Sequence, residues 1–329
     1  AVRGLSLSLS LGECFGLLGP NGAGKSTTIS ILIGRLTATL GKQFVAALDL
    51  RRGASAVHQY IGVCPQFDVI WPDLSVEEHL VFQARQRGIS SGKISAAVQR
   101  AAAAVHLDGD AYNTKASGLS GGMRRRLTIA MAILGNPPIV LMDEPTTGLD
   151  PDNRQQVWKI IQSLKSPDRL ILLTTHSMEE AEALCTRIGI MAHGRLMCVG
   201  SSQHLKTQFG KGYTLTVNCV SEKERHAALQ GGAAGGDDRG GDTAANLSDI
   251  FATLDAFVLN DVGRGKASKL TRINRTTRYL IEKDKGISVA DIFRKLEARR
   301  HSLGIREWGL AMTTLEEVFI AAVSEGAAH

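Results

Sequence analysis

One short string constrains this chain more than any other part of it. The compact apolar run CFGLLG (14–19) leads into GPNGAGKS (19–26), which fits the pattern G-x-x-x-x-G-K-S/T. The next residues, TTISILIGRL (27–36), have helical character. A glycine-rich turn between a strand and a helix points successive backbone N–H groups into a nest for an anion, and the helix N-terminus adds favourable partial charge. The string therefore predicts a phosphate-binding loop.

The side chains in and beyond this loop suit a polyphosphate with a divalent cation. Lys25 can reach the β- and γ-phosphates, and the hydroxyl of Ser26 can ligate Mg²⁺. Asp143 and Glu144 end a second apolar run, IVLMDE (139–144). One carboxylate there can hold Mg²⁺, and its neighbour can orient or deprotonate an attacking water. The alternative for Glu144 is an ordinary exposed acid at the end of a strand.

Short apolar runs alternate with helical segments through the first two thirds of the chain. The runs 14–19, 139–144 and 170–176 each stop at glycine or at polar residues, and residues 76–107 are mostly helical in pattern. This alternation is typical of βαβ units around a buried parallel sheet. Helix starts are indicated by capping-box spacing, or by a cap before proline, at Ser75/Glu78, Ser177/Glu180 and Asp150/Pro151.

The remaining residues have a different pattern. Gly, Ala and Asp dominate residues 231–246, which we interpret as a flexible loop, and a strand-like segment, TRYLIEK (277–283), lies further on. Apolar residues at helical spacing surround these segments: Leu247, Ile250, Phe251, Leu254 and Val258; Val289, Ile292, Phe293, Leu296 and Leu303; Leu315, Val318, Phe319 and Ala322. We therefore predict two domains, 1–217 and 218–329, the second a small α+β domain without catalytic residues.

Composition argues against several other classes of protein. No apolar run approaches the ~18–20 residues that cross a bilayer. The five cysteines include no C-x-x-C pair, which argues against a zinc site or a disulfide framework and favours a reducing, cytosolic setting. The net charge of +6 lies wholly in residues 1–217 and fits an ordinary solvated surface, so no nucleic acid partner is predicted. Because the chain begins with Ala1, we expect a piece of a longer protein.

A second glycine turn precedes another helical stretch. Ser120, Gly121 and Gly122 stand before the stretch from Met123 to Leu134, so this turn can also bind an anion. Since one nucleotide rarely needs two such turns, the second turn indicates a partner molecule. The three arginines at 124–126 are interpreted as a solvated helix face, with phosphate contact as the alternative.

Two further residues gain meaning only from their order in the chain. Gln66 follows a short strand and His176 ends another, and each of them alone is more often structural than functional. They join the phosphate loop, LSGG (119–122), the DE strand end and TTGLD (146–150) in one ordered series. This order resembles the nucleotide-binding domain of ATP-binding cassette (ABC) transporters, over residues 1–217.

The finer strings are similar to the A subfamily of these transporters, the group associated with lipid export. They include GECFGLLGPNGAGKST, CPQFD, SVEEHL, LSGGMRRRLT, PPIVLMDEPTTGLDP and CVGSSQHLKTQFGKGYTL. TTLEEVF (313–319) is similar to the end of the small regulatory domain that follows each cassette. The resemblance implies a P-loop NTPase fold, an α/β ABC ATPase cassette with a parallel-sheet core and a helical subdomain, plus a small α+β C-terminal domain.

The resemblance also implies a role for each matched residue. Glu144 would be the catalytic base, His176 a γ-phosphate sensor, and Gln66 a link between the site and the membrane domain. The metal would be held by Ser26, Gln66 and Asp143. ATP would be bound by Gly19, Asn21, Gly22, Gly24, Lys25, Ser26 and Thr27, and the site of an opposite cassette would be completed by Ser120, Gly121 and Gly122, with Asp150 at the seam.

The implied activity is ATP hydrolysis that powers transmembrane export of lipids or related amphiphiles through ATP-driven dimerisation of two cassettes. The implied partners are a second ABC cassette, in the same molecule or homologous, and transmembrane domains outside this chain that contact the lipid-like cargo. The chain would then lie on the cytosolic face of a membrane. The strings AVRG (1–4) and HSMEEAEALCTR (176–187) look more like the second half of a full transporter.

Two other interpretations stay open. One is the detached ATPase subunit of a bacterial-type ABC exporter of drugs or polysaccharides, which shares most of these motifs. The other is an ABC ATPase acting on nucleic acid or ribosomes, against which the short interval from Lys25 to Leu119, without sustained heptads, argues. The sequence also departs twice from the family pattern. Met123 stands where glutamine is common, and the aromatic residue that usually stacks on adenine would lie upstream of Ala1.

Overall fold

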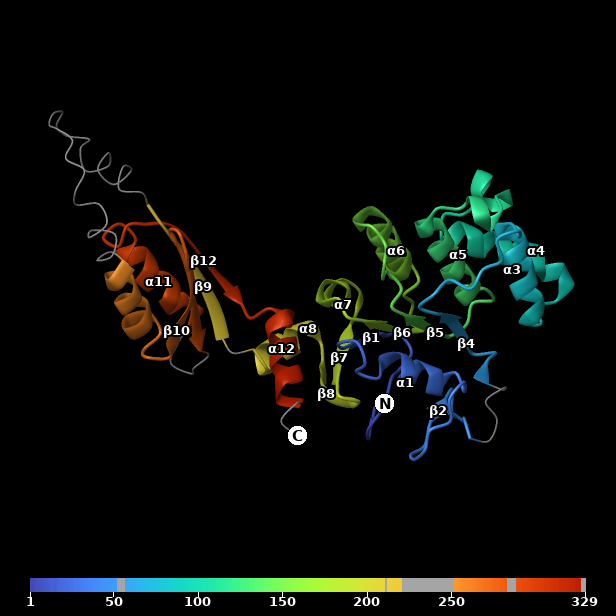
Figure 1. The fold of residues 1–329 in the computed structure, drawn as a ribbon, viewed down its shortest axis with the longest axis horizontal. Helices are drawn as coiled ribbons and strands as arrows, with labels where there is room; N and C mark the ends of the chain where they lie inside the picture. The colour runs from blue at the N-terminus through green and yellow to red at the C-terminus, as the bar shows by residue number, and fades with distance from the viewer. Residues whose placement is uncertain (52–56, 211, 221–250, 283–287, 327–329) are drawn as a thin grey trace. The chain divides into compact units, whose positions relative to one another are not determined.

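The computed structural model describes residues 1–51, 57–210, 212–220, 251–282 and 288–326 (Figure 1). The chain forms two compact units, one made of Ala1–Leu205 with the chain from Phe319 onward, and the other of Lys206–Val318. The predicted boundary between residues 217 and 218 falls inside strand β9 (Gly212–Cys219), which belongs to the sheet of the second unit. The predicted flexible loop at 231–246 lies outside the described residues.

The first unit is built on a six-stranded sheet in the order β4-β5-β6-β1-β7-β8. Neighbouring strands are parallel except β7 with β8. The strands β1, β5 and β6 are almost wholly buried and apolar, as parallel strands covered on both faces must be. The predicted parallel-sheet core is confirmed. The strands are β1 (Cys14–Leu18), β4 (Ile61–Cys64), β5 (Ile139–Asp143), β6 (Leu170–Thr175), β7 (Arg187–Ala192) and β8 (Arg195–Gly200).

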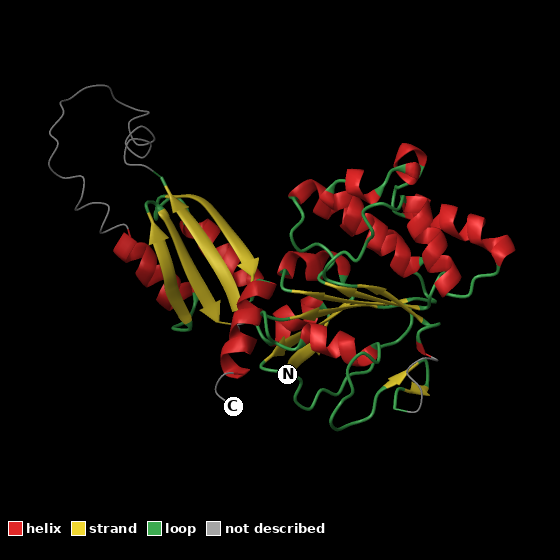
Figure 2. Cartoon of the chain, turned by 45° about the vertical axis from the view of Figure 1, so that its right-hand side comes forward, coloured by secondary structure: helices red, strands yellow, loops and turns green. Residues whose placement is uncertain are grey.

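Helices cover both faces of this sheet (Figure 2), and β5 shows how the core is divided. Val140 and Met142 join a core that includes residues of five helices, whereas Leu141 points to the other face and packs near α1 (Lys25–Leu32). The five helices are α3 (Val76–Gln86), α4 (Ser91–Ala104), α5 (Gly121–Ile133), α6 (Pro151–Ser163) and α7 (Met178–Leu184). Shorter elements are β2 (Phe44–Val45), β3 (Leu48–Asp49), η1 (Gly109–Asn113), η2 (Ala116–Gly118) and α8 (Ser202–Gln208).

Two of the predicted helix starts are confirmed. Ser75 Oγ accepts a hydrogen bond from the N–H of Glu78 at 3.2 Å, and the Glu78 carboxylate accepts one from the N–H of Ser75 at 2.7 Å, which completes a capping box. Asp150 caps α6 directly before Pro151 and accepts from the N–H of Asn153 at 2.9 Å.

The third helix start is only half a capping box. Ser177 Oγ accepts from the N–H of Glu180 at 3.3 Å. The carboxylate of Glu180 is buried and accepts instead from Thr146 Oγ1 at 2.7 Å and from Trp158 Nε1 at 3.2 Å. The capping spacing located the helix but not the partners of its glutamate, because those partners lie on other elements.

The second unit contains a four-stranded antiparallel sheet in the order β10-β11-β9-β12. Alternate residues of β9 and β11, including Leu215, Val217, Tyr279 and Ile281, form its core with residues on helical segments. The bounds are β10 (Ala267–Ile273), β11 (Thr276–Glu282), β12 (Ile305–Met312), the π-helix η3 (Phe257–Val262) and α11 (Val289–Arg299). The helix α12 (Leu315–Gly326) begins in the second unit and belongs to the first unit from Phe319 onward.

The predicted apolar face of α11 is narrower than its sequence spacing indicates. Ile292 and Leu296 are buried, but Val289 and Phe293 are 46% and 56% exposed. Phe293 packs edge-on against Trp308 of β12, with 4.8 Å between ring centroids. The predicted helical spacing is thus confirmed, but only Ile292 and Leu296 of these four apolar residues are buried in the core.

No helix in the described ranges is both long and apolar enough to cross a bilayer. All five cysteines lie in described segments and are free thiols, in line with the absence of a predicted disulfide framework.

Candidate active site

The predicted site residues follow the carboxyl ends of four neighbouring strands. β4, β5, β6 and β1 lie in this order and are parallel, so the segments that follow them meet at one edge of the sheet. Gln66 follows β4, His176 follows β6 and the glycine-rich loop follows β1, while Asp143 is the last residue of β5 and Glu144 comes directly after it. The order of strands in the sheet therefore brings together residues that are far apart in the sequence.

Glycine is required at several positions of the loop after β1. Gly22 and Gly24 have φ of 79° and 104°, in the left-handed region that favours glycine. A Cβ on Gly19 would lie 2.5 Å from the carbonyl oxygen of Met191. Gly24 is the N-cap of α1, and no side chain caps this helix, so its first backbone N–H groups can face an anion. Asn21 is exposed and Thr27 is half-buried.

The ammonium group of Lys25 lies folded into this loop. Lys25 is only 4% exposed, and its Nζ donates to the carbonyl oxygens of Gly19 at 2.8 Å and Pro20 at 3.2 Å. It also pairs with Glu144 Oε1 at 3.4 Å. One buried cation thus contacts both the loop and the acid at the end of β5.

A hydroxyl and a carboxylate meet beside Lys25. Ser26 Oγ donates to Asp143 Oδ1 at 3.0 Å, and Thr174 Oγ1 of β6 donates to the same oxygen at 2.5 Å. Hard oxygen donors of this kind are the ligands that Mg²⁺ prefers. The described residues hold no cluster of three or more His, Cys, Asp or Glu that could bind a metal alone. Ser26 and Asp143 thus fit an ion that takes its remaining ligands from water and phosphate.

Glu144 is buried, not an exposed acid at the end of a strand. Its relative exposure is 6%, and its backbone has φ of 47°, a left-handed conformation that is uncommon outside glycine. Its N–H donates to the carbonyl oxygen of Thr174 at 3.1 Å and to Thr174 Oγ1 at 3.0 Å. The alternative of a simple surface carboxylate is therefore wrong.

Polar groups from several segments surround the Glu144 carboxylate. Oε2 accepts from Thr147 Oγ1 at 3.0 Å and from Gln66 Nε2 at 3.2 Å, and it lies 3.4 Å from His176 Nδ1. Burial alone would raise the pKa of Glu144, but the Thr147 hydrogen bond and the charges of Lys25 and His176 lower it below its ordinary value of 4.5. Glu144 is therefore an ionised carboxylate at neutral pH.

His176 and Gln66 both contact Glu144. His176 is 51% exposed, so one side of its imidazole stays open to an incoming group. The amide of Gln66 donates to Glu144, and the described residues contain no hydrogen bond from it to Ser26 or Asp143. The structure thus brings Lys25, Ser26, Gln66, Asp143, Glu144 and His176 together.

A second group of predicted residues lies at the starts of two other helices, α5 and α6. Ser120 caps α5 by accepting from the N–H of Met123 at 3.2 Å, and Asp150 caps α6. In the ranges that the structure describes, no hydrogen bond or ion pair joins Ser120, Gly121, Gly122 or Asp150 to the phosphate loop or to Glu144.

One residue lies against both of these separate turns. A Cβ on Gly122 would lie 2.0 Å from Asn153 Oδ1, so the turn Ser120–Gly122 packs directly on the Asn153 side chain. Asn153 Nδ2 in turn donates to Asp150 Oδ2 at 2.6 Å.

Sequence reasoning missed three residues near the site. Thr147 and Thr174 donate to the carboxylates of Glu144 and Asp143, and a threonine by itself gives no distinctive signal in the sequence. Arg125 was placed on a solvated helix face, but it is only 4% exposed and bonds to backbone carbonyls around Gln66 and Glu144. That interpretation was wrong for Arg125, since its acceptors come from segments 18 to 60 residues away.

The sequence of this chain is similar to a known protein family and to known proteins. A family model described as "ABC transporter" matches residues 2–147. The chain is 39% identical over 97% of its length to "ABC transporter A family member 5" of Arabidopsis thaliana, and 38% identical over its full length to "ABC transporter A family member 7" of the same plant. It covers 31% and 32% of these two proteins, so it spans about a third of their length.

Solved structures resemble a large part of this chain. The structure described as the ATP binding subunit of an ABC transporter superposes with a TM-score of 0.57 at 28% identity, over 63% of this chain and 86% of that one. A dimeric ATP-binding cassette in a post-hydrolysis state, bound to ADP and Pi, gives a TM-score of 0.56 at 23% identity, over 61% of this chain and 90% of that one. At 23% identity, the second similarity shows a shared fold only.

Proposed function

This chain is an ABC-type ATPase cassette related over nearly its whole length to A-family ABC transporters, and from that premise we propose that it binds ATP with Mg²⁺ and powers transmembrane export of lipids or related amphiphiles. The observation that carries the proposal is the meeting of Lys25, Ser26, Asp143 and Glu144, with 3.0 to 3.4 Å between their polar atoms, beside an uncapped helix N-terminus.

The proposed chemistry starts with the binding of the triphosphate. Backbone N–H groups of the loop and of the first turn of α1 hold phosphate oxygens, and Lys25 moves its contacts from Gly19 and Pro20 to the β- and γ-phosphates. Ser26 and Asp143 are the residues that would hold Mg²⁺, which screens the phosphate charge when bound. The site thereby offers preorganised positive charge where the transferred group gains negative charge.

Glu144 is proposed as the group that accepts a proton from the attacking water. Its carboxylate is ionised, buried and held by Thr147 and Gln66, so one oxygen can orient a water towards the γ-phosphate. His176 Nδ1 lies 3.4 Å from the oxygen that Thr147 and Gln66 also contact, and the side chain is half exposed, which suits contact with the γ-phosphate. These roles agree with those that the family resemblance implies.

The separate turns at Ser120–Gly122 and Asp150 support a second cassette as partner. A helix start with a Ser-Gly-Gly turn suits phosphate, yet it has no described bond to the phosphate loop of its own chain. We propose that it contacts the nucleotide of an opposite cassette, in the same molecule or homologous, so that each closed pair contains two ATP sites.

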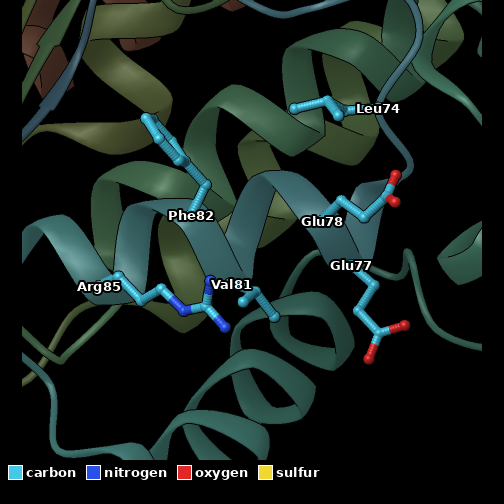
Figure 3. Close-up of a pocket in the computed structure, with 6 residues that line it drawn as sticks. All are labelled: Leu74, Glu77, Glu78, Val81, Phe82 and Arg85. Atoms are coloured by element: carbon cyan, nitrogen blue, oxygen red, sulfur yellow. The ribbon is translucent and has the colours of Figure 1, made fainter.

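A cluster of exposed apolar residues supports transmembrane domains as the other partner. Phe67, Val69, Trp71 and Phe82 are 77%, 66%, 45% and 40% exposed, and Phe67 directly follows Gln66. Trp71 and Phe82 pack edge-on with 5.1 Å between ring centroids. Figure 3 shows Phe82 beside a pocket along α3, which Leu74, Glu77, Glu78, Val81 and Arg85 also line. An apolar surface with a charged rim is typical of a protein interface.

This surface provides a mechanical connection for the proposed motor. Movement of a partner against Phe67 would reach Gln66, whose amide contacts Glu144 at 3.2 Å. The cassette would then lie on the cytosolic face of a membrane, where ATP is available. The alternative is a detached ATPase subunit of a bacterial-type exporter, and the 28% identity to a structure described as the ATP binding subunit of an ABC transporter fits a separate subunit. We favour the A-family function because that likeness is closer and includes the second unit.

Replacing Lys25 with alanine tests the nucleotide site. The variant should bind Mg-ATP about a hundredfold more weakly, because a buried charge-assisted contact to phosphate is lost. Titration calorimetry on this chain measures the Kd, and thermal unfolding shows whether the variant folds. Lys159→Ala on the exposed face of α6 is the matched control and should bind normally. Equal affinity in the Lys25 variant would contradict the proposed site.

Replacing both Trp71 and Phe82 with serine tests the membrane partner. In the full-length protein, reconstituted in phospholipid vesicles, lipid-stimulated ATP hydrolysis should fall about tenfold, since central aromatic residues carry much of the energy of an interface. Basal hydrolysis should stay within about twofold because neither side chain contacts the nucleotide site. Leu40→Ser, at an 86% exposed apolar residue elsewhere, is the control. Unchanged lipid stimulation would exclude this surface as the contact.

A further inference from the structure

Arg125 is the most extensively bonded side chain near the site, and the roles assigned so far do not include it. It lies on α5, one turn after the Ser120 cap, and it is 4% exposed. Its guanidinium donates to acceptors on two other segments, and an arginine fork with five N–H groups is the side chain suited to this. A residue this well bonded fixes the relative positions of the segments that it joins.

The first segment joined to α5 is the turn after β4. Arg125 Nη1 donates to the carbonyl oxygens of Pro65 at 2.6 Å and Gln66 at 3.3 Å, and it pairs with Asp68 Oδ1 at 3.1 Å. Thr128 Oγ1, one turn further along α5, donates to the same Asp68 oxygen at 2.9 Å. The backbone that carries Gln66 is therefore attached to α5 on both sides of the glutamine.

The second segment is the turn that carries Glu144. Arg125 Nη2 donates to the carbonyl oxygens of Asp143 and Glu144, both at 3.1 Å, and Nε donates to that of Pro145 at 2.7 Å. Three successive carbonyls are thus held by one side chain. Glu144 is also the residue with the uncommon left-handed φ of 47°, which persists only where the surroundings over-determine it.

We propose that Arg125 is a positioning residue that holds the Gln66 turn and the Glu144 turn in fixed positions relative to α5. Its guanidinium donates to the Glu144 carbonyl, while Thr174 accepts from the Glu144 N–H. Both backbone groups of Glu144 are therefore held, and this sets the direction of its carboxylate. The same bonds transmit any displacement of the Gln66 turn or of α5 to the base. This role rests on the proposed function in one respect, that Glu144 acts on ATP.

Arg125→Lys is the informative variant, because lysine keeps the positive charge but cannot reach both segments at once. We expect kcat for ATP to fall about tenfold or more while KM changes less than about twofold, since the base is misplaced and the phosphate contacts are intact. Hydrogen exchange should become faster at the amides of residues 66–68 and 146–147. Asp68→Asn should give a smaller change in the same direction.

The neighbouring Arg126 offers a matched control on the same helix. Its Nη1 donates to the carbonyl oxygens of Val105 at 3.2 Å and His106 at 2.9 Å, away from the site. Arg126→Lys should therefore lower the thermal midpoint without changing kcat by more than about twofold or exchange at residues 66–68 and 146–147. This control distinguishes displacement of the Gln66 and Glu144 turns from a general loss of α5 stability.

The exchange measurement needs no turnover, so the inference and the proposed function can fail separately. Absence of ATP hydrolysis in the unaltered chain would overturn the function, and exchange alone would then decide the role of Arg125. Unchanged exchange at both turns in Arg125→Lys would overturn that role. An equal loss of kcat in Arg126→Lys would overturn it as well, because a merely structural effect would then be sufficient.

Discussion

Glu144→Gln is expected to abolish ATP hydrolysis and to leave ATP binding nearly unchanged. Glutamine has the size of glutamate but cannot accept a proton from water, and a general base contributes about 10²- to 10⁴-fold to a rate. Turnover in this chain should therefore fall at least about a hundredfold. Lys25 keeps its bonds to Gly19 and Pro20, so the loop should retain its shape and its affinity.

The measurements are phosphate release for turnover and titration calorimetry for the Kd of Mg-ATP. Glu179→Gln, at an exposed acid in the first turn of α7, is the matched control and should hydrolyse normally. Because the pKa of Glu144 lies below 4.5, turnover should not decline through protonation of this group until the pH falls below that value. Survival of turnover in Glu144→Gln would show that another group is the base.

Gly62→Ala is expected to have the largest effect on the stability of the first unit. The added Cβ would lie 1.9 Å from the carbonyl oxygen of Ala132 on α5 and 2.9 Å from its carbonyl carbon, and also 2.9 Å from Pro137 Cγ. Backbone cannot rotate away as a long side chain can, so β4 and α5 must move apart. Overpacking of this kind costs about 3 kcal/mol, which lowers the thermal midpoint of a unit of this size by about 6 to 12 °C.

Thermal unfolding followed by circular dichroism measures this effect. Gly92→Ala is the matched control, since this glycine lies in the first turn of α4 and no atom would come within 4 Å of its added Cβ. It should unfold within about 2 °C of the unaltered chain, or slightly higher, because alanine favours helix. A Gly62 variant with an unchanged midpoint would mean that β4 does not pack on α5 as closely as described.

The strand ends and the phosphate loop could be predicted from the sequence because their chemistry is local. Gly22, Gly24, Lys25 and Ser26 follow a buried strand within a few residues, and Asp143 ends another. Buried parallel strands also have near-continuous apolar runs, which makes the sheet visible in the sequence. The meeting of these segments then follows from the order of neighbouring strands.

The contacts that hold the site could not be predicted, because they join residues far apart in the chain. Nothing in a run of three arginines distinguishes Arg125, whose acceptors follow β4 and β5, from Arg126, whose acceptors follow α4. The buried carboxylate of Glu180 has the spacing of a cap but bonds to Thr146 and Trp158. The hydrogen-bond partners of these side chains depend on how the elements pack together, and residue spacing along the chain carries no information on that packing.

The position of Asn153 has a thermodynamic consequence for a closed pair of cassettes. Its side chain lies against Gly122 and donates to Asp150, so one residue supports both of the turns that we propose to contact the opposite cassette. Nucleotide binding at the Ser120–Gly122 turn could change the affinity of Asp150 for its partner. Linkage then requires that partner binding at Asp150 change the nucleotide affinity by the same free energy. Asn153 would then couple the nucleotide contact at Gly122 to the contact at Asp150, with the same free energy in both directions.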